Sequence, residues 1–352
     1  MKTQYIRIAV LNLIILIATM PTGNAKLEEK YPIFLTKYTF SKDDFKVAQV
    51  LFPSKDEEIK RIRISGTDAS YFKIDKENFI WVKPDKNKAL YQIILEVKDK
   101  KGKIHSQYFT IIKDEFIKNK VIAHRGAWKN TKVPENSIAA LQKAIDLGCQ
   151  GSEFDVQLSY DSVFFVNHDP DYKGKIIDRT MSSDLSEIKL ENGESLPLLK
   201  EYLQTGMKQN KTKLILEIKP TNHSKQRVDL LARKAIELVT ENQAQAWVEY
   251  ISFDFELCKA LLKYDPFCKV AYLNGDKSPK ELHDAGLYGL DYHHRVFKKN
   301  PDWIKQSLDL GLTVNTWTVN DKETMQWFLD RDVSFITTNE PELLLEMINK
   351  NL

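Results

Sequence analysis

Residues 151–169 read GSEFDVQLSYDSVFFVNHD, and this stretch decides the fold prediction for most of the chain. It contains two apolar runs of strand length, separated only by residues 159–162. A crossover between parallel strands needs about a dozen residues or more, so these two strands must form an antiparallel hairpin. Side chains two positions apart on a strand point to the same side, so Glu153 and Asp155 lie together. The hairpin returns His168 to their level.

Charged residues also stand at the ends of other apolar runs. The run VIAHRG brings His124 and Arg125, and the run LILEIKP carries Glu217 and Lys219. A charge is tolerated in a protein interior only when it is paired or bound to a metal. Polar residues on several neighbouring strands therefore predict one shared polar site, and we expect the function to reside there.

From residue 121 onward, strand-like runs alternate with amphipathic stretches such as NSIAALQKAIDLG. The runs fall at 121–124, 151–158, 163–167, 213–218, 248–253, 269–273, 287–292, 312–319 and 334–338. This alternation is typical of an α/β fold, and we predict a TIM-type (β/α)8 barrel over residues 116–352 with its site at the carboxyl face of the strands. The run in excess of eight is the antiparallel strand of the hairpin.

Residues 27–115 show a different pattern. Short aromatic and β-branched segments alternate with Ser, Gly, Asp and Lys turns, without a helical period. This pattern predicts a small antiparallel β-sandwich as an accessory domain. Residues 64–83 and 90–113 resemble a cadherin-like repeat, but lysines at 98, 100 and 101 stand where further carboxylates would be needed for calcium. We therefore expect a structural or targeting module without calcium.

Residues 1–25 are typical of a secretory signal peptide. Lys2 and Arg7 precede an apolar run that is too short to span a bilayer, and small residues follow at 23–25. We expect cleavage, export to a periplasmic or extracellular location, and no stable membrane span afterwards. Loss of these two basic residues lowers the formal net charge from +3 to +1, which gives no reason to expect nucleic-acid binding. The sequence does not indicate an oligomeric state.

The three cysteines, Cys149, Cys258 and Cys268, allow at most one intramolecular disulfide. Cys258 and Cys268 are the candidates for pairing. The alternative is that all three are buried thiols that pack as small apolar residues.

Several short motifs occur in an order and spacing that resemble one known family. They are His124-Arg125-Gly126, Pro134-Glu135-Asn136-Ser137, Glu153-Phe154-Asp155-Val156, His168-Asp169, Leu216-Glu217-Ile218-Lys219 and Trp317-Thr318-Val319-Asn320. Over 121–350 the chain resembles the glycerophosphodiester phosphodiesterases. The resemblance implies a TIM-type barrel that uses a divalent cation to hydrolyse glycerophosphodiesters to sn-glycerol 3-phosphate and an alcohol.

The resemblance also implies roles for individual residues. The metal ligands would be Glu153, Asp155 and Glu217, the proton-transfer residues His124 and His168, and the phosphate-binding residues Arg125 and Lys219. Three carboxylates without sulfur or paired imidazole ligands suit Ca²⁺ or Mg²⁺ rather than zinc. Attack by the substrate's own hydroxyl, giving a cyclic phosphate, and direct attack by water both remain open.

Five further residues have weaker signals. Trp317 either packs the barrel core or faces the substrate, and Asp169 is expected to support His168. Glu135 belongs to a helix-start motif and is a candidate to orient Arg125. The pair His293-His294 is interpreted as a solvated loop pair rather than a second metal site.

The sequence also departs from the family pattern. Asp161-Ser162 replaces the usual Asp-Gly of the hairpin turn, and residues 170–196 replace a Gly-rich stretch, which leaves the preferred alcohol open. A related phospholipase-type enzyme acting on intact lipids would need an apolar platform at the barrel mouth, and the mostly polar segment 170–200 disfavours it. The remaining alternative is a non-catalytic envelope- or glycan-binding protein.

Overall fold

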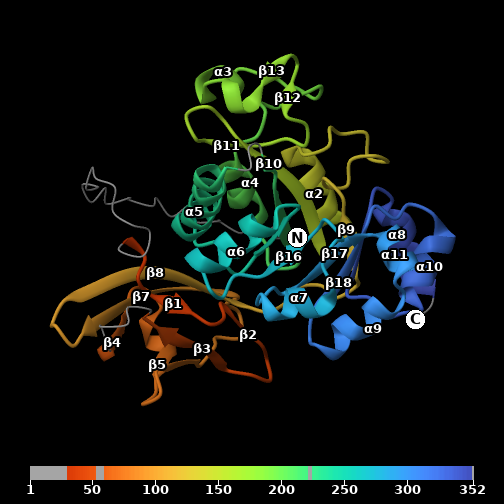
Figure 1. Ribbon diagram of the computed structural model, residues 1–352. Coiled ribbons are helices and arrows are strands. Elements are labelled where there is room, and N and C mark those ends of the chain that lie inside the picture. Colours follow the sequence, from red (N-terminus) through yellow and green to blue (C-terminus); the bar gives the residue numbers. More distant parts are fainter. Residues whose placement is uncertain (1–29, 53–58, 221–223, 351–352) are drawn as a thin grey trace, which may run out of the picture.

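The computed structural model describes residues 30–52, 59–220 and 224–350. An all-β region formed by the N-terminal part of the chain lies against a barrel formed by the rest (Figure 1). The expected signal peptide, residues 1–25, falls outside the described residues. Within the described ranges, none of the helices combines the length and the apolar character that crossing a membrane requires.

The N-terminal region is a sandwich of two sheets, each with four strands in the described residues. One sheet has the order β1 (Phe34–Leu35), β3 (Lys46–Leu51), β6 (Phe79–Val82) and β5 (Phe72–Ile74). The other has the order β2 (Thr39–Phe40), β8 (Ile104–Lys113), β7 (Leu90–Asp99) and β4 (Ile59–Ser65). Alternate side chains of both sheets, such as Val47, Ile80 and Leu95, form a separate buried core.

The sequence predicted a purely antiparallel sandwich, but the structure contains one parallel pair of strands. Strand β2 pairs with β8 in the parallel direction. Strands β1 and β2 are close in sequence but lie in opposite sheets, so the chain crosses between the sheets and β2 joins the second sheet without a hairpin. Asp99 lies in the segment that resembles a cadherin repeat, among the lysines that argue against calcium binding. It accepts a hydrogen bond from the Lys103 amide at 2.9 Å and lies 3.1 Å from His105 Nε2. Its carboxylate therefore stabilises the β7–β8 turn.

The barrel prediction is confirmed. The parallel strands are β9 (Val121–Ala123), β10 (Gly151–Leu158), β14 (Lys213–Ile218), β15 (Val248–Ser252), β16 (Val270–Tyr272), β17 (Gly289–His293), β18 (Thr313–Trp317) and β19 (Phe335–Thr338). The sheet closes because β9 pairs with both β19 and β10. The extra strand β11 (Phe164–Val166) runs antiparallel to β10, with Val156 opposite Val166 and Leu158 opposite Phe164, as the hairpin argument required.

Helices surround the barrel (Figure 1). They are α2 (Ile138–Leu147), α4 (Leu199–Gly206), α5 (Lys225–Glu241), α6 (Phe255–Tyr264), α7 (Pro279–Asp284), α8 (His294–Lys299), α9 (Asp302–Asp309), α10 (Lys322–Leu329) and α11 (Pro341–Lys350). Helix α2 begins where the Ser137 hydroxyl accepts a hydrogen bond from the Ala140 amide, and it ends at Gly148, whose φ of 75° suits glycine. Ser137 rather than Asn136 is therefore the N-cap, which leaves Asn136 for another role.

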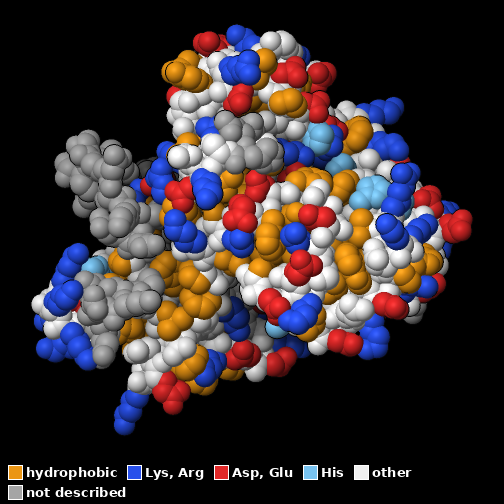
Figure 2. Space-filling model, viewed as in Figure 1, with side chains coloured by type: hydrophobic (Ala, Val, Ile, Leu, Met, Phe, Trp, Pro, Cys, Tyr) orange, Lys and Arg blue, Asp and Glu red, His pale blue; other side chains and the backbone are white. Residues whose placement is uncertain are grey.

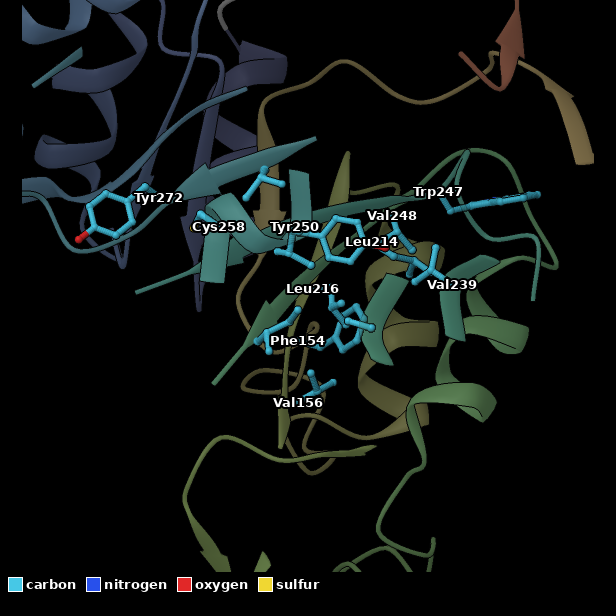
Figure 3. Close-up of a cluster of buried hydrophobic side chains, with 14 of the residues drawn as sticks. Phe154, Val156, Leu214, Leu216, Val239, Trp247, Val248, Tyr250, Cys258 and Tyr272 are labelled. Carbon is cyan, nitrogen blue, oxygen red and sulfur yellow. The ribbon is translucent and has the colours of Figure 1, made fainter. Parts of the chain in front are cut away.

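Successive side chains of each barrel strand face opposite ways. Those that point outward pack against the helices, as Figure 3 shows for Phe154 and Leu216, and Phe154 stacks on Tyr202 with ring centroids 4.2 Å apart. Those that point inward, such as Ile215 and Ile251, form a smaller cluster inside the barrel. This alternation also brings Glu153, Asp155 and Glu217 to the inner side.

Residues 170–198 form a small lobe beyond the end of β11, at the top of Figure 1. The lobe contains β12 (Asp171–Tyr172), β13 (Lys175–Ile176), the 3-10 helix η2 (Ile177–Arg179) and α3 (Ser182–Ser186). It has its own buried apolar cluster, which includes Ile177, Leu185 and Leu196. The lobe is thus a folded insertion and not a plain loop.

All three cysteines are free thiols. Cys149 and Cys258 are buried and Cys268 is half-buried, which agrees with the interpretation that they pack as small apolar residues.

Candidate active site

Three carboxylates meet inside the barrel near its carboxyl end. Glu153 and Asp155 are on β10, and Glu217 on β14 lies directly opposite Asp155 in the strand register. All three side chains are buried, and one carboxylate oxygen from each lies within 4.8 Å of the others. In the parts of the chain that the structure describes, this is the one cluster of acidic, His or Cys side chains with metal-ligand geometry.

The carboxylates strongly perturb one another. Burial raises the pKa of Glu153 well above its usual range, and repulsion from Asp155 and Glu217 adds to this effect. Burial and the neighbouring Asp155 raise the pKa of Glu217 to about 8. Burial alone would also raise the pKa of Asp155, but Lys219, His168 and the hydrogen bond from Asn136 together lower it. The cluster therefore lacks positive charge.

Two basic side chains partly compensate this charge. Lys219 Nζ is 2.9 Å from Asp155 Oδ1 and 2.5 Å from Glu217 Oε1. Arg125 Nε is 3.6 Å from Asp155 Oδ2, and the Arg125 amide donates a hydrogen bond of 2.8 Å to Glu153 Oε2. Two cationic groups thus face three carboxylates.

The loop that carries Arg125 is held in an unusual conformation. Arg125 has a φ of 58°, in the left-handed region that non-glycine residues seldom adopt. Its Nη1 donates to Glu135 Oε1 at 2.7 Å, so Glu135 does orient this guanidinium. Asn136, also at positive φ, donates from Nδ2 to Asp155 Oδ2 at 2.9 Å and accepts from the Asp155 amide at 3.1 Å. The Pro-Glu-Asn-Ser motif therefore fixes both Arg125 and Asp155.

His124 follows β9 at the edge of the cluster. Its Nδ1 lies 2.7 Å from the Asn339 side-chain oxygen, which makes Nδ1 the donor and leaves Nε2 facing Glu153 Oε2 at 4.0 Å. Burial, together with the adjacent Arg125, lowers the pKa of His124 to about 4. The imidazole is therefore neutral near pH 7 and can accept a proton at Nε2.

His168 reaches the site from the second strand of the hairpin. Its Nδ1 lies 2.7 Å from Asp169 Oδ1, and its side chain remains about one-third exposed. The buried Gln157 donates from Nε2 to the carbonyl oxygen of His168 at 2.9 Å and also to that of Asp169. The backbone of the His-Asp pair is thus anchored to β10. Histidine side chains gather where the upper lobe meets the barrel (Figure 2).

An aromatic wall faces the charged residues across the mouth. Trp317 is partly buried, and its indole nitrogen donates to the Asp291 carbonyl oxygen at 2.9 Å. Its ring meets those of Phe253 and His293 edge-on, with centroids 5.5 and 5.1 Å away. His293 is the last residue of β17 and packs on Trp317, so its interpretation as half of a solvated loop pair was wrong. The residue ends a strand, and its Nδ1 accepts a hydrogen bond of 3.2 Å from the Arg295 amide at the start of α8.

The carboxylate cluster fits a hard divalent cation. Ca²⁺ and Mg²⁺ bind oxygen ligands at about 2.0–2.6 Å, and oxygens within 4.8 Å of one another can share one such ion. Glu153 Oε1 is buried and has no hydrogen-bond partner among the described residues. An unpartnered buried carboxylate oxygen costs free energy that a bound cation would recover.

Comparisons with known proteins identify the family of this chain. Residues 124–343 match the family model described as the glycerophosphoryl diester phosphodiesterase family. The chain belongs to this family. The matched residues include each of the charged and histidine side chains described above, and the family prediction from the sequence motifs is confirmed.

Individual relatives agree. A glycerophosphodiester phosphodiesterase from Caldanaerobacter subterraneus subsp. tengcongensis is 30% identical over 253 residues, which cover 66% of this chain and 99% of that protein. A glycerophosphodiester phosphodiesterase structure from Parabacteroides distasonis is 40% identical, with a TM-score of 0.64, and the match covers 68% of this chain and 99% of that one. A phosphodiesterase structure from Oleispira antarctica, in complex with the product sn-glycerol-3-phosphate, shares the fold at 21% identity and a TM-score of 0.57, over 65% of this chain and 96% of that one.

Sequence reasoning did not assign site roles to three amide side chains. Asn136 holds Asp155, Asn339 holds His124, and Gln157 holds the backbone of the His-Asp pair. A signal existed for Asn339, because it follows the strand FITT as the other polar residues follow theirs. Gln157 gave a weaker signal, because its position two residues after Asp155 on β10 puts it on the same face.

Proposed function

We propose that this protein hydrolyses glycerophosphodiesters to sn-glycerol 3-phosphate and an alcohol, with one Ca²⁺ or Mg²⁺ held by Glu153, Asp155 and Glu217. The observation that carries the proposal is the convergence of three buried carboxylates, two basic side chains and two histidines at one end of the barrel. Family membership and the relatives named glycerophosphodiester phosphodiesterase support it.

A phosphodiester is an anion that repels nucleophiles, so its hydrolysis needs positive charge at the non-bridging oxygens. A bound cation would supply Lewis acidity at those oxygens. Arg125 binds the phosphate through its guanidinium, which Glu135 keeps in place, and Lys219 adds a point charge from the opposite strand. Both basic side chains lie beside the carboxylates, and they are therefore close to where the phosphate would bind.

Proton transfer falls to the two histidines. His124 is neutral near pH 7 and accepts the proton of the attacking hydroxyl at Nε2, since Asn339 occupies its Nδ1. His168 donates a proton to the leaving oxygen from Nε2, while Asp169 accepts from Nδ1 and would stabilise the imidazolium. The attacking hydroxyl belongs either to water or to the glycerol moiety.

The test is a coupled assay for released sn-glycerol 3-phosphate with several glycerophosphodiesters as substrates. We expect turnover that a chelator abolishes and that added Ca²⁺ or Mg²⁺ restores. Full turnover by metal-free protein would disprove the metal site, and no release from any glycerophosphodiester in the presence of both cations would disprove the substrate class. Replacing water by ¹⁸O-labelled water and following a cyclic phosphate by ³¹P NMR distinguishes the two routes of attack.

One observation favours a second candidate, the cleavage of intact lipids. Ile176 and Met181 on the lobe, and Tyr160 in the hairpin turn, are exposed at 43%, 45% and 69%. Thr180 links these residues. Its carbonyl oxygen accepts a hydrogen bond of 3.0 Å from the Tyr160 amide, and its Oγ1 donates one of 2.7 Å to the Ile176 carbonyl oxygen. A lysophospholipid as substrate tests this activity, with the released head-group alcohol as the measured product, because the other product is a lysophosphatidate and not sn-glycerol 3-phosphate. Turnover above that of the glycerophosphodiesters would favour the lipid candidate.

We also propose that the protein is exported, on the basis of the sequence of residues 1–25 alone. N-terminal sequencing of the protein secreted by its host tests this, and an N-terminus at Met1 would contradict it.

A further inference from the structure

A cavity of about 580 Å³ lies at the amino end of the barrel, where the sandwich covers it. Thr36, Tyr38 and Asp114 of the sandwich region form one wall, and Ile122 and Ile215 of the barrel interior form part of the floor. We call it the junction cavity. Its volume lies within the range of sites that bind small organic molecules. The family match begins at residue 124, so the sandwich wall lies outside that match.

The junction cavity contains a lysine without an acidic partner. Lys213, the first residue of β14, donates from Nζ to the Ala246 carbonyl oxygen at 2.6 Å and lies 3.8 Å from the centre of the Phe116 ring. In the described residues no carboxylate forms an ion pair with it. Burial lowers the pKa of Lys213 to about 8, which reflects the cost of a desolvated ammonium group.

The buried carboxylate that acts most strongly on Lys213 is already engaged. Glu249 accepts from Lys269 Nζ at 3.1 Å, and Lys269 also donates to the Tyr288 hydroxyl at 3.3 Å. The charges that act on Lys213 are Glu249, Lys269 and Asp114, and Asp114 is exposed at the rim. Two ammonium groups therefore share one buried carboxylate.

None of the other charged groups that line the junction cavity forms an ion pair with Lys213 in the described residues. Lys120 forms an ion pair with Asp332. Asp265 acts on the hydroxyls of Tyr38 and Tyr250 but is not among the groups that influence Lys213. Exposed lysines 37 and 118 also line the cavity, and Lys37 forms an ion pair with Asp44 at 3.2 Å.

The rest of the lining is largely apolar and aromatic. Phe116, Tyr250 and Phe335 contribute rings, and Val248 contributes an aliphatic side chain. We propose that the junction cavity binds a small organic monoanion with an apolar body, a carboxylic acid of medium chain length, whose carboxylate pairs with Lys213 while its chain lies against these rings. A single negative charge matches the ammonium group of Lys213, which has no carboxylate partner among the described residues.

Octanoate is a suitable probe, and titration calorimetry with the full mature chain measures its binding. We expect one equivalent to bind, and we expect the neutral octanamide to bind at least about 10-fold more weakly because it lacks the charge. Lys213→Met keeps the apolar stem of the side chain and should weaken octanoate binding by a similar factor. Lys200→Met, on the exposed face of α4, should leave it unchanged.

The active site also contains basic groups, so the location of binding needs its own control. Lys219→Met removes the ammonium group at the other end of the same strand, and octanoate binding in the junction cavity should not respond to it. Gln245→Trp places a large side chain in the junction cavity without changing its charge and should weaken binding as Lys213→Met does. If Lys213→Met shows no cooperative thermal transition and is therefore not folded, Gln245→Trp still tests whether octanoate binds in the junction cavity.

Three results would overturn the proposal. They are no octanoate binding at millimolar concentration, undiminished binding in both cavity variants, and a loss of binding confined to Lys219→Met. None of these results depends on whether the protein hydrolyses glycerophosphodiesters.

Discussion

The two ends of this barrel bury charges of opposite sign. At the carboxyl end, Glu153, Asp155 and Glu217 outnumber the two basic groups that face them. At the amino end, the structure shows no carboxylate paired with Lys213 in the described residues, because Glu249 is paired with Lys269. Strand β14 spans both regions, with Lys213 at its start and Glu217 near its end.

This difference teaches how a barrel can carry two ligand sites of opposite charge. A buried charge in excess of its partners costs free energy, and a ligand of the other sign offsets that cost. The carboxyl end therefore suits a cation that in turn binds a phosphate. The amino end suits an anion, provided that a second domain covers it.

The largest effect that we expect comes from the acidic end of this comparison. Asp155→Asn and Glu217→Gln each remove a negative charge that a divalent cation needs, and we expect kcat to fall by about 10²-fold to 10³-fold or more. Steady-state release of sn-glycerol 3-phosphate measures this. Glu256→Gln, on the exposed surface of α6, should keep wild-type turnover. Near-normal kcat in both site variants would show that catalysis does not need these carboxylates, and the contrast between the two ends of the barrel would then fail.

The second prediction concerns His168 and distinguishes a loss of catalysis from a loss of stability. His168→Ala should lower kcat by about 10²-fold or more, because the leaving oxygen loses its proton donor. Its side chain is about one-third exposed, so the thermal midpoint should change little. The matched control is His283→Ala, on the half-exposed face of α7. If His168→Ala retains normal turnover, His168 has a structural role and the acid must be another group.

The third effect belongs to the amino end and concerns pH. Burial raises the pKa of Asp265 to about 6, whereas an unfolded aspartate titrates near about 3.9. Between these values the folded state binds the proton more tightly, so the stability associated with this group is present at low pH and is lost as pH rises through about 6.

Asp265→Asn should therefore stabilise the protein by about 1–3 kcal/mol at pH 7, and the gain should vanish near pH 4. The Phe267 amide donates to Asp265 Oδ1, and the asparagine oxygen can replace that acceptor. Urea unfolding at the two pH values measures the difference, with kcat as the control, which should not change. A gain of equal size at both pH values would show that the carboxylate charge is not its cause.

The smallest effect that we expect comes from removing the sandwich. A truncated chain that begins near Glu115 keeps the barrel and every residue of the acidic site, so kcat should stay close to that of the full chain. Ion pairs across the junction, such as Lys30 with Glu237, would be lost, and these exposed contacts contribute little stability. The fragment 27–115 should be inactive. A large loss of kcat in a truncated chain with a native circular dichroism spectrum would show that the two ends are coupled.

The sequence determined the barrel and most of the acidic site because both rest on local rules. Strand runs and helical periods are set by neighbouring residues, and the short connection after Ser159 allows only an antiparallel hairpin. The side-chain alternation of a strand then places Glu153 and Asp155 on one face. In a parallel barrel the carboxyl ends of all strands meet, so the polar residues that follow them converge without further information.

Only the tertiary structure decided the rest. The partners of the site residues, such as Asn339 beside His124, come from opposite ends of the barrel sequence, and no local pattern links them. The parallel pairing of β2 depends on how two sheets pack, and the contact of His293 with Trp317 depends on where β17 ends. The junction cavity exists only because the sandwich covers the amino end of the barrel. The charge of Lys213 depends on which residues long-range packing brings next to it, and no single segment of the chain determines those neighbours.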